Sequence, residues 1–168
     1  MSFYLKKNNM KIIRITLWML LFITFFSCER DDICIDPTTP KVIVKFHDAL
    51  NHQNVKSVNK LKVEIDSLGV FIPFGEVKSV DSILIPLRID QDITKIRVTK
   101  NAGESTEISD EWNLAYQREL KFVSRSCGYK TIFLNTENQS NTTNWMQEVE
   151  IIYQNIENEK KTHILIYH

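Results

Sequence analysis

Glycine and paired metal ligands are scarce in this chain, which argues against several enzyme classes. Only 4 of the 168 residues are glycine, and no glycine-rich loop is present to cradle a phosphate group. No Gly-x-Ser-x-Gly motif positions a serine nucleophile. The 4 histidines do not form a His-x-x-x-His or Glu-x-x-His pair of the kind that binds metal on a helix. We therefore expect no cofactor, no metal and no catalytic residues.

The chain also lacks a concentration of basic charge. It contains 21 basic and 21 acidic residues, but the first 27 residues hold four of the basic side chains and none of the acidic ones. The remaining chain therefore has 17 basic and 21 acidic residues, a net charge of −4. Such a balance argues against nucleic-acid binding and against a basic face lying on anionic lipid.

The apolar run from Ile15 to Ser27 is shorter than the roughly 20 residues that a membrane-spanning helix needs. It follows a basic start and ends directly before Cys28. This arrangement is typical of a bacterial lipoprotein signal, and a start at Met10 would preserve it. We expect residues 1–27 to be removed as a signal peptide. The alternative is a short anchor that is never cut.

Cys28 is then the acylated first residue of the mature protein, although Phe25-Phe26 departs from the commonest pattern before such a cysteine. The alternative is an ordinary thiol after a non-lipid cut. Each acyl chain, such as palmitate, would add about 0.8 kcal/mol of membrane affinity per buried methylene. We expect residues 28–40 to form a lipidated tether and the protein to lie in the cell envelope, at the periplasmic or surface face of the outer membrane.

Two further cysteines, Cys34 and Cys127, remain once Cys28 carries lipid. In an oxidising envelope such a pair tends to form a disulfide, whereas two independent buried thiols are the alternative. A redox-active pair is not indicated, because no Cys-x-x-Cys spacing is present. A bridge to Cys34 would hold the domain near the bilayer, because the chain from Cys28 to Cys34 spans at most roughly 20 Å.

Alternation of apolar and polar residues dominates the rest of the chain. A period of two indicates half-buried strands. We expect residues 41–168 to form a single β-sandwich, Greek-key and immunoglobulin-like in type. The predicted strands lie at 42–46, 61–66, 83–89, 96–98, 112–122, 129–134, 149–153 and 163–167.

Several local features sharpen this prediction. Pro86 indicates an edge strand or a bulge, because proline cannot donate to the hydrogen-bond ladder. The run 112–122 fits one long strand or two strands with a break near Gln117. Residues 135–144 are polar and predict a surface loop, and residues 47–59 are expected to carry a turn of helix. Residues 163–167 are apolar on both faces, which indicates a central strand.

The apolar segment 69–75 is the best candidate for a binding loop, through Phe71, Ile72 and Phe74. Its glycines and its proline argue against a continuous strand. If exposed, it would offer a contact surface for a partner. The alternative is a loop that closes one end of the sandwich and belongs to the core.

The best local cluster of metal-ligand types is His47-Asp48 with His52, and polar loop residues are the plainer interpretation. His163 falls on an apolar strand face, where a buried histidine with satisfied hydrogen bonds is expected. The cluster nevertheless supports an alternative function, a small envelope hydrolase or a metal-binding protein.

Four segments resemble an uncharacterised family of small Bacteroidetes lipoproteins: residues 28–34, 38–41, 123–129 and 163–167. The resemblance implies an envelope lipoprotein but no assigned activity. We therefore expect a membrane-anchored, non-catalytic module that binds a protein or a glycan or has a structural role.

Overall fold

The computed structural model describes residues 14, 16, 18, 19, 33–35 and 38–168. The chain separates into two units, Met1–Ile33 and Cys34–His168. In the first unit the described residues Arg14, Thr16, Trp18 and Met19 are helical. Among the described residues, no helix combines the length and the apolar character needed to cross a membrane.

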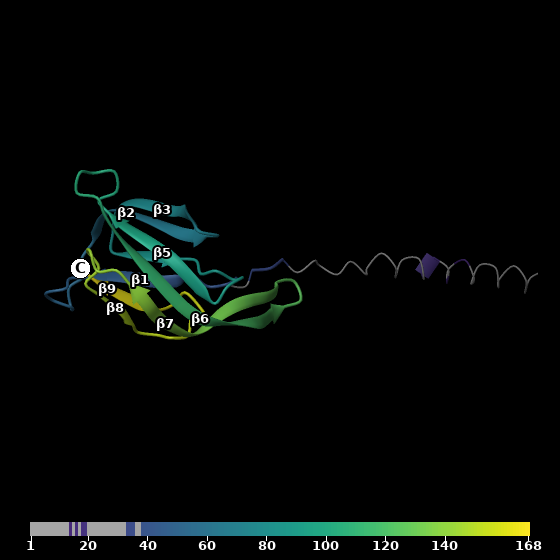
Figure 1. Cartoon of the computed structure of the whole chain (residues 1–168). Helices are drawn as coiled ribbons and strands as arrows, with labels where there is room; N and C mark the ends of the chain where they lie inside the picture. Colours follow the sequence, from purple (N-terminus) through teal and green to yellow (C-terminus); the bar gives the residue numbers. More distant parts are fainter. Residues whose placement is uncertain (1–13, 15, 17, 20–32, 36–37) are drawn as a thin grey trace, which may run out of the picture. The chain divides into compact units, whose positions relative to one another are not determined.

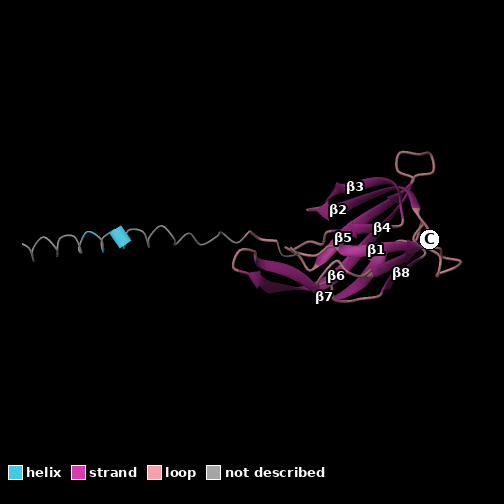
Figure 2. Ribbon diagram, turned by 180° about the vertical axis from the view of Figure 1, so that it is seen from behind, coloured by secondary structure: helices cyan, strands magenta, loops and turns pink. Residues whose placement is uncertain are grey.

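The second unit is an all-β sandwich of two sheets (Figure 1), as predicted. The four-stranded sheet has the order β4-β1-β9-β8, with bounds Ser82–Ile85, Val42–His47, Ile164–Tyr167 and Glu148–Ile151. The five-stranded sheet has the order β3-β2-β5-β6-β7, with bounds Val70–Val80, Val58–Ser67, Ile93–Lys100, Ile108–Ser124 and Gly128–Asn141. Strands dominate residues 38–168, where no helix occurs (Figure 2).

Most neighbouring strands run antiparallel, but β1 and β9 pair in parallel, with Val44 opposite Ile164 and Phe46 opposite Ile166. The chain crosses between the sheets four times: from β1 to β2, from β3 to β4, from β4 to β5 and from β7 to β8. The sandwich prediction is thus confirmed, and the finer immunoglobulin-like assignment stays a prediction.

The core lies between the sheets and follows the alternation read from the sequence. The inward side chains of the central strands are fully buried, among them Phe46, Leu61, Ile96, Trp112 and Ile166. Strand β9 lies between β1 and β8, the central position that its apolar residues on both faces indicated. Pro86 directly follows β4, an edge strand, as its missing N–H requires.

Strand β6 combines both alternatives considered for the run 112–122. It is one continuous strand of 17 residues, yet its pairing with β7 shifts between Ala115 and Gln117, at the predicted break. In Figure 1 the β6–β7 hairpin reaches beyond the other labelled strands at the end opposite the C-terminus. Gly128 starts β7 with a φ of 68°, a conformation that suits glycine.

Three local predictions were wrong. The polar residues of 135–144 do not begin a loop, because β7 continues to Asn141 through backbone pairing with β6. Residues 47–59 contain no helical turn. The segment around Phe71 is not a loop: β3 is an 11-residue strand, and a shift in its pairing with β2 near Pro73 accommodates the proline.

Candidate binding surfaces

Strand β3 forms one edge of the five-stranded sheet, with β2 on one side and, among the described residues, no strand on the other. Its apolar side chains are unusually exposed: Val70 is 65% accessible, Ile72 52% and Phe74 40%. Leu68, in the turn before the strand, is exposed as well. The edge position and these exposures mean that β3 offers both main-chain groups and apolar side chains.

Phe71 lies differently from its neighbours. It pairs with Asp66 of β2 and is covered by Arg97 of β5, whose Cζ lies 3.8 Å from the ring centroid. The Arg97 guanidinium is held in turn by Glu111, with Nη2 2.8 Å from Oε1. Of the three residues predicted for the binding segment, Ile72 and Phe74 are therefore exposed and Phe71 is half-buried.

A second exposed apolar surface lies at the tip of the β6–β7 hairpin. Phe122 and Tyr129 are cross-strand partners and meet edge to face, with ring centroids 5.4 Å apart. They are 56% and 67% exposed, and Leu120, on the same face, is 70% exposed. This surface is not evident from the sequence, because Leu120 and Phe122 continue the alternation of the buried Trp112, Leu114 and Tyr116.

The predicted disulfide joins Cys34 to Cys127, with 4.9 Å between the Cα atoms. Cys127 lies in the turn of the hairpin, so the bridge attaches the segment before β1 to the hairpin tip. Ile35, next to Cys34, is 90% exposed. The tip thus gathers the disulfide and four exposed apolar side chains: Ile35, Leu120, Phe122 and Tyr129.

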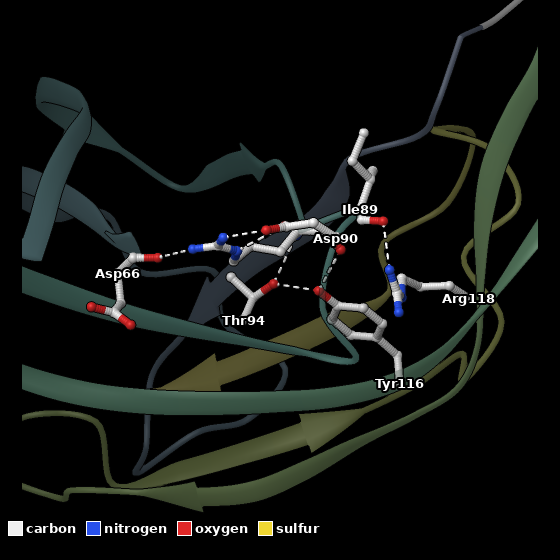
Figure 3. A network of polar contacts seen from close by, with 7 residues as sticks. Asp66, Ile89, Asp90, Thr94, Tyr116 and Arg118 are labelled. Carbon is white, nitrogen blue, oxygen red and sulfur yellow. Dashed lines mark hydrogen bonds and ion pairs between the residues drawn. The ribbon is translucent and has the colours of Figure 1, made fainter. Parts of the chain in front are cut away.

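The loop between β4 and β5 is held by a closed ring of hydrogen bonds (Figure 3). The Arg88 N–H donates to Thr94 Oγ1 over 2.9 Å. Thr94 Oγ1 lies 2.6 Å from Tyr116 Oη, which donates to the Arg88 carbonyl over 2.8 Å. Burial of the Tyr116 phenol raises its pKa, so it stays protonated and remains a donor.

Two arginines connect this ring to its surroundings (Figure 3). Arg88 donates to the Asp66 carbonyl and pairs with Asp90. Arg118 donates to the Ile89 carbonyl over 2.7 Å and to Asp92 over 2.6 Å. Arg88 thus ties the loop to the Asp66 carbonyl of β2, and Arg118 ties it to β6, so the network positions the loop beside these two strands.

Asp110 of β6 organises the segment before β8. Its carboxylate accepts hydrogen bonds from the backbone N–H groups of Asn144, Trp145 and Met146 and from Thr142 Oγ1. Burial acts to raise the pKa of Asp110, but these hydrogen bonds outweigh it, and the pKa lies below the ordinary value. The buried carboxylate is a structural anchor.

The three residues of the predicted metal cluster have other contacts. His47 Nδ1 lies 2.6 Å from the His52 carbonyl, and the His52 ring stacks on Tyr167 at 4.0 Å. Asp48 accepts from the Leu50 N–H and faces Lys56. Within the part of the chain that the structure describes, no group of three or more His, Cys, Asp or Glu residues is arranged to hold a metal ion.

His163 is buried, and its Nδ1 accepts a hydrogen bond from the Ile43 N–H over 3.0 Å. Burial lowers the pKa of its imidazole. This matches the expected buried histidine with satisfied hydrogen bonds. Cys28, the predicted lipid attachment residue, lies outside the described residues.

These observations define the molecule as an all-β sandwich with two exposed apolar surfaces, one along β3 and one at the hairpin tip. Residues 66–168 match the model described as "Family of unknown function (DUF6452)", and the chain belongs to this family. Searches of curated proteins and of solved structures found no match.

Proposed function

We propose that this protein is a Bacteroidetes-type envelope lipoprotein, anchored by acyl chains on Cys28, whose β-sandwich binds another protein through β3. The observation that carries the binding role is the exposure of Val70, Ile72 and Phe74 on an edge strand. Soluble proteins protect such edges or use them, because unpaired ladder groups beside apolar side chains invite another strand.

The proposed address rests on the first residues of the chain. A basic start, a short apolar run and Cys28 follow the order of a lipoprotein signal. The disulfide between Cys34 and Cys127 supports an oxidising compartment. The outer membrane is the proposed site of anchoring.

A binding role is also favoured because several polar side chains make their contacts within the fold. The Tyr116 ring, the Asp110 anchor and the contacts of His47 and His52 are each used within the fold. A general acid or base must instead reach a substrate proton. Tyr116, Asp110, His47 and His52 therefore fit structural roles, and the proposed module is non-catalytic.

Between a protein and a glycan, β3 favours a protein. An extended peptide that adds to a sheet edge gains main-chain hydrogen bonds, and its side chains meet the alternate side chains of the edge. The 11 residues of β3 offer room for such an added strand.

The anchor is tested in cells fed a fatty-acid analogue that can be detected on proteins. The full chain should incorporate the label, and Cys28→Ser should remove it. Label that persists in Cys28→Ser, or its absence from the unmodified chain, would contradict the proposed address.

The binding surface is tested with a photo-activated cross-linking residue placed at Ile72 in the full chain, in native envelopes. Leu84 is a matched control, because it is an exposed apolar residue on the edge strand of the other sheet. We expect a discrete protein adduct from position 72 that Phe74→Asp weakens, and none from position 84. Equal adducts from both positions, or none from position 72, would refute the role of β3.

A further inference from the structure

The hairpin tip carries apolar side chains that stay largely exposed, although Phe122 and Tyr129 contact each other. Leu120, Phe122 and Tyr129 point to one face of the hairpin, and each is more than half exposed. The tyrosine combines an apolar ring with a polar hydroxyl, a combination that suits the boundary between water and lipid. Phenylalanine and leucine beside it would enter the more apolar layer.

The charge of the hairpin differs from that of the chain as a whole. Residues 118–130 contain four basic side chains, Arg118, Lys121, Arg125 and Lys130, and one acidic side chain, Glu119. Arg118 and Lys121 are paired with Asp92 and Glu157, and Arg125 is exposed at the turn. The net charge of −4 for the chain after residue 27 does not reveal this local excess. Lys130 Nζ donates to the Glu157 carbonyl, so Arg125 at the turn is the basic side chain that is placed to meet an anionic lipid headgroup.

The disulfide brings the tip near the proposed anchor. Cys127 in the hairpin turn is bonded to Cys34, and only five residues separate Cys34 from Cys28. A chain of this length spans at most about 20 Å. Acyl chains on Cys28 would therefore keep the tip within a short distance of the bilayer surface.

We propose that the tip of the β6–β7 hairpin rests on the lipid bilayer and inserts Phe122 and Tyr129 at its interface. This inference rests on the proposed lipid anchor on Cys28 and adds a second, non-covalent membrane contact. The lipid then holds the domain in one orientation. The turn at 101–107 and the C-terminus, at the other end of the sandwich (Figure 1), face away from the membrane.

The test uses the full chain, expressed with its own leader, purified and placed in vesicles of phosphatidylethanolamine and phosphatidylglycerol. The variant Tyr129→Trp puts a fluorophore at the tip, and lipids brominated near the headgroup quench a tryptophan that touches them. Ser105→Trp is the matched control, because Ser105 is exposed in the turn at the opposite end. Trp112 and Trp145 are buried, and the unsubstituted protein measures their background.

We expect brominated lipid to reduce the added emission of Tyr129→Trp at least twofold and to leave Ser105→Trp unchanged. Phe122→Trp provides a second tip variant and should behave like Tyr129→Trp. Mass spectrometry of the Cys28 peptide reports the acyl chains independently.

Acylated protein without quenching at positions 122 and 129 would overturn the tip contact and leave the anchor intact. Equal quenching at 105 and 129 would also overturn it, because the orientation would then not be fixed. Protein without acyl chains on Cys28 would overturn both the anchor and the contact that rests on it.

Discussion

The two halves of β6 have the same pattern in sequence and opposite environments in the structure. Leu114 and Leu120 lie on one strand at positions of the same parity, yet Leu114 is 0% exposed and Leu120 is 70% exposed. The first half pairs with β5 and β7, whereas the second half pairs with β7. Leu114 belongs to the core cluster together with side chains of the four-stranded sheet such as Phe46, and Leu120 does not. Burial therefore depends on whether the opposing sheet covers the strand, and alternation alone defines only its face.

The difference also separates stability from function. The covered half holds Trp112, Leu114 and Tyr116 within the core, so changes there should act on folding. The uncovered half exposes Leu120 and Phe122, so these side chains do not stabilise the isolated domain by being buried. Exposed apolar side chains that gather in this way usually mark a contact.

The largest expected effect on the free energy of unfolding comes from truncating Leu114, with Leu120 as its comparison. Leu114→Ala removes a fully buried side chain and leaves a cavity, so it should lower the free energy of unfolding by about 4 kcal/mol. Leu120→Ala should change it by less than about 0.5 kcal/mol. Urea unfolding of the two purified variants measures both values. Comparable losses would mean that the second half is covered in solution.

Asp110 should be the next most costly position in the covered half. Asp110→Ala leaves three backbone N–H groups without their acceptor and should cost about 3 kcal/mol of unfolding free energy. The neighbouring Glu111→Ala loses only the partly exposed ion pair with Arg97, which should cost less than about 1 kcal/mol. Urea unfolding at neutral pH tests the pair, and a loss for Asp110→Ala no larger than for Glu111→Ala would contradict the anchoring role.

The uncovered half should contribute to stability mainly through the disulfide. Cys34 and Cys127 are 93 residues apart in sequence, but in the folded state the Thr131 N–H already holds Thr39. In the unfolded chain the bond closes a long loop, whereas in the folded state it restrains only the short segments next to the Thr39–Thr131 contact. The difference in loop entropy means that the double change to serine should cost about 2 kcal/mol of unfolding free energy. The same loss in unfolding free energy should follow from reducing agent added to the unmodified protein. No change would show that the bridge does not constrain the unfolded chain.

Most strands could be predicted from the sequence, because alternation records which residues face the core. The parallel contact of β1 with β9 could not, since it joins Val44 to Ile164 and no local pattern encodes such a partner. The extension of β7 to Asn141 was missed for a related reason. Its polar residues resemble a loop in composition, yet backbone pairing with β6 continues past them.

The candidate surfaces were predicted less completely. The segment with Ile72 and Phe74 was recognised because it is apolar, although glycine and proline suggested a loop instead of an edge strand. The hairpin tip was missed, because nothing in the residues from Trp112 to Phe122 shows where the opposing sheet ends. Two sequence signals could have drawn attention to the tip: a cysteine close to Phe122 and Tyr129, and the excess of basic residues in 118–130.

The smallest expected effect is a pH dependence of the free energy of unfolding, and it arises in the four-stranded sheet that covers the first half of β6. His163 accepts a hydrogen bond from the Ile43 N–H, and burial lowers the pKa of its imidazole below the ordinary 6.5. As the pH falls through 6.5, the unfolded chain gains a proton that the folded state does not bind. The free energy of unfolding should therefore fall, by at most about 1.4 kcal/mol per pH unit for one histidine.

Burial lowers the pKa of His168 as well, so both histidines act in the same direction. In His163→Asn the side-chain oxygen takes the place of Nδ1 as acceptor for the Ile43 N–H, while the titrating group is removed. Between pH 7.5 and pH 5.5 this variant should lose stability with about half the slope of the unmodified protein. An unchanged slope in urea unfolding would assign the pH dependence to His168 or to other groups and would contradict the role of His163.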